Sequence, residues 1–295
     1  IRRPPRSTQG VSSAASDVYK RQIDTRALTR TIRDNGAPKG VLCTRADGQF
    51  DLPALQKKLA EWPGLKGMDL ASVVSTAADF GWSEGSFDLS KNAAETRLEG
   101  LRVVAMDFGC KQNILRCLVD AGCVVDVVPA TTSADDILAR NPDGVFLANG
   151  PGDPAATAEF AVAEIKKLID SEIPIFGICI GHQLLALAMG GRTSKMARGH
   201  RGANHPVRDL TTGQIEITSQ NHGFCVDQDS LPSDVDVTHI SLFDGTVEGL
   251  RHKTKPVFCV QYHPESSPGP HDSRHLFQRF AEMMKVKKMN DDTDN

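Results

Sequence analysis

From Leu101 to Cys179 the sequence alternates short runs rich in valine and isoleucine with longer amphipathic stretches. The apolar runs are LRVVAMDF, CVVDVVPA, GVFLANG and IPIFGIC, and the stretches between them are long enough for helices. Apolar runs of this length are typical of parallel strands buried on both faces, joined by right-handed helical crossovers. The pattern therefore predicts an α/β fold whose open, mostly parallel sheet is flanked by helices. Ligands of such sheets bind at the carboxyl ends of the strands.

The segments on either side of this alternation predict the domain organisation. Residues 1–22 have a Pro-Pro pair, serine clusters, five basic residues and no apolar period, so we expect a disordered, non-native leader. Residues 23–98 carry two helical stretches and a polar linker, which indicates a smaller domain with a boundary near Leu98. Residues 99–288 form the main domain, and residues 289–295 form a polar tail.

Composition limits the kind of partner. A formal net charge of −3 and the lack of a long apolar run give no case for nucleic acid or a membrane as partner. The seven cysteines are odd in number and include no C-x-x-C pair, which argues against a disulfide framework or a zinc site. We expect a cytoplasmic protein that binds small molecules or other proteins.

The segment GICIGHQ, residues 177–183, places Cys179 between a predicted strand and a predicted helix. A sharp strand-to-helix turn crowds the backbone, so side chains at positions 177 and 181 would clash, and both positions hold glycine. The N–H groups and dipole at the helix amino terminus would stabilise a thiolate. The sequence therefore predicts that Cys179 is a nucleophile, the alternative being a buried structural cysteine.

A thiolate nucleophile needs a proton carrier and a group that orients it. In VFCVQYHPE, residues 257–265, a strand ends at His263, and Pro264 stiffens the exit so that Glu265 can bond the second ring nitrogen. Taken alone, His-Pro-Glu is also compatible with a surface turn. Together with the sharp strand-to-helix turn at Cys179, called the elbow below, it predicts a triad of Cys179, His263 and Glu265.

The segment NGPGDP, residues 149–154, directly follows the predicted strand GVFLA. Gly150 and Gly152 leave backbone N–H groups bare beside the strand end, where they could hold an oxyanion together with the N–H of Ile180. The alternative is a type II turn that only joins strand to helix.

Together, the GICIGHQ, NGPGDP and His-Pro-Glu motifs resemble those of the class I (triad) glutamine amidotransferases, over most of residues 101–285. Residues 199–207, GHRGANHPV, and 220–224, QNHGF, resemble one branch, the small subunit of glutamine-dependent carbamoyl-phosphate synthetase. Residues 23–40 resemble that subunit's amino-terminal domain. Because this likeness starts inside that domain, we expect the chain to lack the domain's first part.

The resemblance implies hydrolysis of glutamine to glutamate and ammonia. Cys179 would attack the carboxamide, His263 would protonate the leaving ammonia and then activate water, and Glu265 would orient His263. The backbone of Gly152 and Ile180 would hold the oxyanion. The implied glutamine contacts are Gly150, Gly152, Ile180, Gln183, Asn221, Gly223 and Phe224. From the residues alone, Asn221 to Gly223 could equally be a turn, and Phe224 a core aromatic.

The resemblance also implies a partner. The ammonia would pass to a carbamoyl-phosphate synthetase large subunit in a heterodimer, and that subunit would use ATP and magnesium to make carbamoyl phosphate for pyrimidine and arginine biosynthesis. This chain shows no nucleotide-binding fingerprint, so we expect no cofactor on it. Its histidines 182, 200, 205 and 222 show no repeated ligand spacing, so we expect structural hydrogen bonds and no metal site.

Three alternatives stay open. A cysteine peptidase would also use an elbow cysteine and a histidine, but it would not need the amides of Gln183 and Asn221. A non-catalytic subunit would have lost a member of the triad, and this chain keeps all three. A glutaminase component of a different synthetase would show the same triad and glutamine contacts. It would lack the resemblance of residues 23–40 to the amino-terminal domain of the small subunit.

Overall fold

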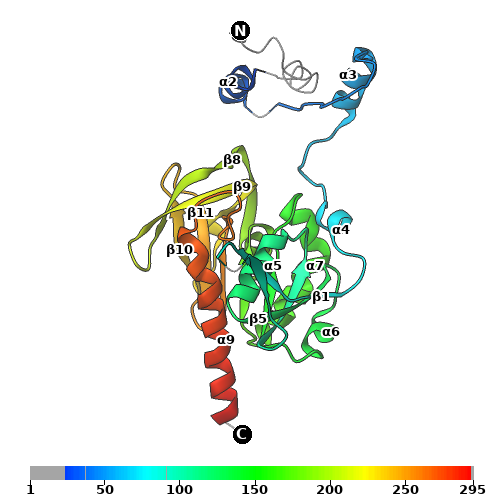
Figure 1. The fold of residues 1–295 in the computed structure, drawn as a ribbon. Coiled ribbons are helices and arrows are strands. Elements are labelled where there is room, and N and C mark those ends of the chain that lie inside the picture. Colours follow the sequence, from blue (N-terminus) through cyan, green and yellow to red (C-terminus); the bar gives the residue numbers. More distant parts are fainter. Residues whose placement is uncertain (1–23, 37, 91, 294–295) are drawn as a thin grey trace. The chain divides into compact units, whose positions relative to one another are not determined.

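The computed structural model describes residues 24–36, 38–90 and 92–293. The predicted leader, residues 1–22, lies outside the described residues. The chain divides into two compact units, Ile1–Trp62 and Pro63–Asn295, which are described separately (Figure 1). In the described part of the chain, no helix has the length and apolar character needed to cross a membrane.

The first unit contains two short helices, α2 (Thr25–Asn35) and α3 (Leu52–Glu61). Asp24 caps α2 by accepting a hydrogen bond of 2.9 Å from the N–H of Ala27, and Gly36 is the C-cap of the helix. Asp51 caps α3 in the same way. Neither helix contains a buried residue, so both lack the packed apolar face that stabilises most short helices.

The second unit contains a ten-stranded sheet in the order β1-β5-β4-β6-β7-β12-β11-β10-β8-β9. Its parallel centre consists of β5 (Cys123–Pro129), β4 (Leu101–Asp107), β6 (Gly144–Leu147), β7 (Ile175–Ile178) and β12 (Val257–Val260). The antiparallel strands are β1 (Phe80–Trp82), β11 (Val247–His252), β10 (Val235–Ser241), β8 (Arg192–Asp209) and β9 (Ile215–Asp227). The predicted α/β fold is thus confirmed, with a parallel centre and an antiparallel extension.

Helices cover both faces of the parallel centre (Figure 1). One face packs against α6 (Ala134–Leu138), α7 (Pro154–Asp170) and α8 (Ile180–Ala188), and the other against α5 (Gln112–Asp120) and α9 (His275–Thr293). Alternate residues of β4 enter the two cores, as expected for a strand buried on both sides. Helix α9 continues through residues 289–293, which the sequence assigned to a polar tail. The short elements are α4 (Ala71–Val74), η2 (Gln228–Ser230) and η3 (Asp272–Arg274).

Residues 63–98 contribute to the second unit. Strand β1 pairs with β5, and β2 (Glu84–Asp88) pairs with β3 (Ala93–Thr96) in a small sheet against α5. The N–H of Gly67 donates to Asp153, over 2.8 Å. The sequence assigned the polar segment 91–100 to a linker, but β3 lies within it, and the polar composition of this strand reflects its largely exposed position. By contacts the second unit begins at Pro63, whereas the domain boundary near Leu98 stays a prediction from the sequence.

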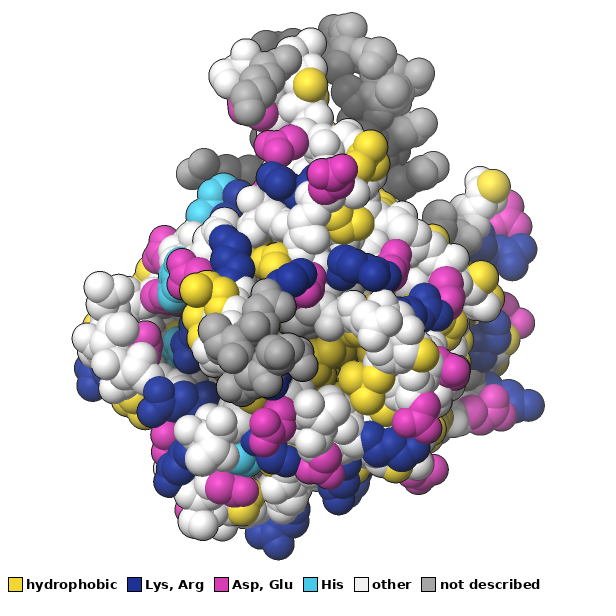
Figure 2. All heavy atoms as spheres, turned by 90° about the horizontal axis from the view of Figure 1, so that it is seen from below, with side chains coloured by type: hydrophobic (Ala, Val, Ile, Leu, Met, Phe, Trp, Pro, Cys, Tyr) yellow, Lys and Arg dark blue, Asp and Glu magenta, His cyan; other side chains and the backbone are white. Residues whose placement is uncertain are grey.

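Charged side chains are interspersed on the molecular face seen in Figure 2. Lys and Arg alternate there with Asp and Glu, and among the described side chains of that face no large area of one sign is visible. This mixture agrees with the formal net charge of −3.

Candidate active site

Cys179 lies at a strained turn between β7 and α8. Its backbone has φ 57° and ψ −105°, a conformation that is unfavourable for a residue with a side chain and persists only where the surroundings fix it. A Cβ atom on Gly177 would lie 2.7 Å from the side chain of Leu185. One on Gly181 would lie 2.3 Å from the carbonyl oxygen of Leu147. The predicted reason for the two elbow glycines is confirmed, and the turn presents Cys179 at the carboxyl end of β7.

His263 and Glu265 follow β12, the strand beside β7. Nδ1 of His263 lies 2.9 Å from Oε1 of Glu265, and the carboxylate is fully buried. Burial disfavours a charged imidazole, but the negative Glu265 and hydrogen bonds to Cys179 and Glu265 outweigh it and raise the pKa of His263 to about 10. Against the opposing effect of burial, the positive His263 lowers the pKa of Glu265. The geometry thus favours a protonated His263 next to the thiol.

A second cation reaches the same carboxylate. Nζ of Lys111 lies 3.2 Å from Oε1 of Glu265 and also donates to the carbonyl of Ser266. Nδ2 of Asn113 donates to the backbone carbonyl of Glu265 over 2.7 Å. The sequence analysis did not identify Lys111 or Asn113, because they lie some 150 residues from Glu265 and no local pattern links them.

A pocket of about 300 Å³ opens over Cys179 and His263. Six of the seven predicted glutamine contacts line it: Gly150, Gly152, Gln183, Asn221, Gly223 and Phe224. The seventh, Ile180, is buried at the first position of α8, where a backbone N–H has no partner within the helix. The fold therefore brings all of the predicted site residues to one place. Other lining residues, which the sequence analysis did not assign to the site, are Leu65, Gly109, Asn149, Pro151, Arg201 and His222.

Two side chains give the pocket its polarity. Nε2 of Gln183 donates to the carbonyl of Phe224 over 3.0 Å and to Gln261 over 2.8 Å, so the carbonyl oxygen of Gln183 is left as an acceptor. Arg201, an exposed residue, contributes a guanidinium that donates to the backbone carbonyls of His200 and His222. Burial lowers the pKa of Arg201, and the electrostatic interaction with Cys179 opposes that effect. The pocket thus combines an acceptor and a cation near the thiol.

An elbow cysteine, a His-Glu pair and a glycine-rich loop at adjacent strand ends form the arrangement expected of a triad amidotransferase, and the family described as "Glutamine amidotransferase class-I" matches residues 104–283. The chain is 58% identical to the carbamoyl phosphate synthase small chain of Caulobacter vibrioides, over 90% of this chain and 69% of that one. It is 56% identical to the one from Brucella anthropi, over 90% of this chain and 65% of that one. The chain belongs to the class I glutamine amidotransferases and, within them, to the carbamoyl phosphate synthase small chains.

These matches confirm the family resemblance seen in the motifs. The chain spans about two thirds of the length of these relatives. Among solved structures, a putative GMP synthase subunit from Thermoplasma acidophilum matches with a TM-score of 0.59 and 23% identity, over 66% of this chain and all of that one. At this identity the structural likeness supports the fold alone.

Proposed function

We propose that this chain hydrolyses the side-chain amide of glutamine and supplies the ammonia to a carbamoyl phosphate synthase large subunit. The observation that carries the proposal is that Cys179, at a strained elbow, and His263 line one pocket, and that the buried Glu265 lies 2.9 Å from Nδ1 of His263. The small-chain relatives support the choice of partner.

The proposed reaction follows from the positions of these groups. The Cys179 thiolate attacks the carboxamide carbon, and the carbonyl oxygen takes the negative charge beside the backbone N–H groups of Ile180 and Gly152. The C–N bond then breaks as His263 gives its proton to the departing nitrogen, which leaves ammonia and a thioester. His263 next accepts a proton from water, whose oxygen attacks the thioester to release glutamate and restore Cys179. Glu265 holds the imidazole through Nδ1.

The pocket supports an α-amino acid as substrate. The free carbonyl oxygen of Gln183 can accept from an α-ammonium group, and the charge of Arg201 suits an α-carboxylate. Gly150, Gly223, Asn221 and Phe224 would complete the contacts along the substrate. A peptidase would need an open groove for a chain on either side of the scissile bond, and the amide-lined pocket favours a single amino acid instead.

The large subunit would carry the ATP and magnesium chemistry, in a heterodimer that makes carbamoyl phosphate for pyrimidine and arginine biosynthesis. All seven cysteines of this chain are free thiols, which supports a reducing, cytoplasmic location.

The decisive experiment measures glutamate release from glutamine, with and without a carbamoyl phosphate synthase large subunit. We expect Cys179→Ser to abolish glutamine-dependent carbamoyl phosphate synthesis in the complex and to leave ammonia-dependent synthesis largely intact. Cys225→Ser, a half-buried thiol that does not line the pocket, is the matched control and should change neither rate. Equal loss of both syntheses in Cys179→Ser would instead assign Cys179 a role in folding or docking.

A glutamine-mimicking alkylator tests the nucleophile directly. It should label Cys179 and spare the other six cysteines, because only Cys179 combines pocket access with a neighbouring imidazole. Peptide mapping of the labelled chain reads this out. Labelling spread over several thiols would overturn the assignment.

A further inference from the structure

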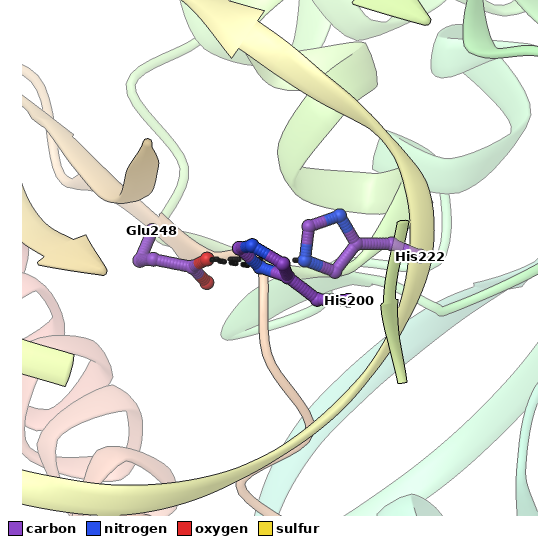
Figure 3. Close-up of side chains that lie close together, drawn as sticks. All are labelled: His200, His222 and Glu248. Atoms are coloured by element: carbon purple, nitrogen blue, oxygen red, sulfur yellow. Dashed lines mark hydrogen bonds and ion pairs between the residues drawn. The ribbon is translucent and has the colours of Figure 1, made fainter. Parts of the chain in front are cut away.

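Three buried side chains from three strands meet next to the pocket wall (Figure 3). His200 comes from β8, His222 from β9 and Glu248 from β11, and each is less than one-tenth exposed. Nδ1 of His200 lies 3.2 Å from Oε1 of Glu248, and Nε2 of His222 lies 3.8 Å from the same oxygen. All three ligand atoms lie within 4.8 Å of one another.

The triangle has the size that a small metal ion requires. With two sides of 3.2 and 3.8 Å and a third side of at most 4.8 Å, a point equidistant from the three atoms lies roughly 2.0–2.4 Å from each. Zinc binds imidazole nitrogen and carboxylate oxygen at about 2.0–2.2 Å. The three groups can therefore approach one ion with little movement.

Each of the three groups is also oriented by a further partner. Nε2 of His200 lies 2.9 Å from Oδ2 of Asp244, and Nδ1 of His222 lies 2.8 Å from the carbonyl oxygen of Phe224. Gln220 donates to Oε2 of Glu248 over 2.9 Å. In metal sites a ligating histidine almost always donates its other ring N–H to a carboxylate or a carbonyl, and a ligating carboxylate is itself hydrogen-bonded. All three groups here follow that pattern.

The atom that points to a missing ligand is Nε2 of His222. It is buried and has no hydrogen-bond partner, while Nδ1 of the same ring is bonded to Phe224. Because Nδ1 donates to a carbonyl, Nε2 carries a lone pair directed at Glu248 and His200 (Figure 3). A buried lone pair without a donor is costly, and a cation between the three groups would satisfy it.

We propose that His200, His222 and Glu248 bind a divalent ion of the zinc class through two nitrogens and one oxygen. The ion would join β8 and β9 to β11, strands that are not all neighbours in the sheet. His222 lines the pocket between Asn221 and Gly223, so the ion would also fix this wall. The sequence analysis predicted no metal site because ligands from three separate strands leave no repeated spacing. The proposal is independent of the proposed reaction.

The test measures Zn²⁺ binding to the tag-free chain carrying Cys179→Ser, which removes the competing thiolate beside His263. Competition with a chromophoric chelator should give one tightly bound Zn²⁺ per chain. Glu248→Gln and His200→Gln should each weaken binding at least about tenfold, as expected when a ligand is removed. His275→Gln is the matched control and should leave binding unchanged. His275 also pairs with a buried carboxylate, Glu216, but among the described residues no third ligand lies beside this pair.

A second measurement needs no substitution within the cluster and so does not depend on how those variants fold. X-ray absorption of the zinc-loaded Cys179→Ser chain should show two imidazoles and oxygen bound to the zinc, with no sulfur. Sulfur ligation, equal affinity in Glu248→Gln and its parent, or no stoichiometric Zn²⁺ would overturn the proposal. Zn²⁺ should also raise the melting temperature of the parent and not that of His200→Gln.

Discussion

At the scale of single residues, the site depends on one buried carboxylate shared by two cations. Glu265 is fully buried and pairs with His263 at 2.9 Å and with Lys111 at 3.2 Å. A buried carboxylate is stable as an anion only when such partners compensate for its lost hydration. The carboxylate therefore holds the imidazole in place and also favours its charged form, which the proposed reaction needs for protonation of ammonia.

The raised pKa of His263 predicts how stability depends on pH. A histidine with a folded-state pKa of about 10, against an ordinary 6.5, contributes its full stabilisation below pH 6.5 and loses it as the pH rises towards 10. The melting temperature of the wild-type chain should therefore exceed that of His263→Asn most at about pH 6 and least near pH 10. Differential scanning calorimetry across this range measures the difference.

The matched control for this measurement is His182→Asn. Burial lowers the pKa of His182 to about 3, so this residue stays neutral over the whole range. The advantage of the wild-type chain over His182→Asn should therefore be constant between about pH 7.5 and pH 10, and it should shrink towards pH 6 because the histidine of the unfolded chain takes up a proton there. A constant difference for His263→Asn as well would contradict the charged His263–Glu265 pair.

Lys111 should act as a positioning residue for the triad. Lys111→Met removes a cation that lowers the pKa of Glu265, so the acid limb of the pH–rate profile should move to higher pH. We expect kcat/KM for glutamine hydrolysis to fall about tenfold, or ~1.4 kcal/mol of transition-state stabilisation. Lys111→Arg keeps the charge and should recover most of the rate. A purely structural role would lower the melting temperature without moving the acid limb.

At the scale of elements, the elbow between β7 and α8 depends on close backbone packing. Helix propensity alone predicts that Gly181→Ala stabilises α8 by about 1 kcal/mol. The new Cβ would lie 2.3 Å from the carbonyl oxygen of Leu147, however, and relieving such a contact costs about 1–3 kcal/mol or more. We expect the clash to dominate, so that Gly181→Ala lowers the free energy of unfolding in urea and displaces Cys179.

Gly81→Ala gives the comparison for this substitution. Gly81 lies in β1, and a Cβ there would meet no atom closer than Asp126, at 4.0 Å. This variant should therefore unfold within about 0.5 kcal/mol of the wild-type chain. If the two alanine variants had the same stability, the elbow would be less crowded than the structure indicates.

At the scale of the whole molecule, stability should come from the second unit. The two helices of the first unit contain no buried residue, whereas both core clusters lie within residues 63–295. A chain of residues 63–295 should therefore melt within about 2 °C of the full chain, since exposed segments contribute few native contacts. Calorimetry of the shortened chain tests this expectation.

The domain boundary near Leu98 can be tested with a second shortened chain. Removal of residues up to 98 would also delete β1, Ala71 of the core and the bond from Gly67 to Asp153. A chain of residues 99–295 should therefore melt several degrees lower than one of residues 63–295. Equal melting temperatures would favour the boundary near Leu98.

The sequence by itself predicted the parallel centre and the main site residues, because both leave local signals. Buried strands appear as unbroken apolar runs, and the elbow appears as glycines two positions from Cys179. The sequence His263-Pro264-Glu265 likewise predicted that an imidazole and a carboxylate lie together at the end of one strand. The glutamine contacts came from the resemblance of longer motifs to a family.

Only the tertiary structure brought in the partners that are distant along the chain. Lys111 reaches Glu265 across 154 positions, and Arg201 enters the pocket from β8, because strand order decides which ends are neighbours. The antiparallel extension was missed because β8 and β9 are rich in polar residues and lack long apolar runs. His200, His222 and Glu248 meet for the same reason: a folded sheet can place residues together whose spacing in the sequence carries no pattern.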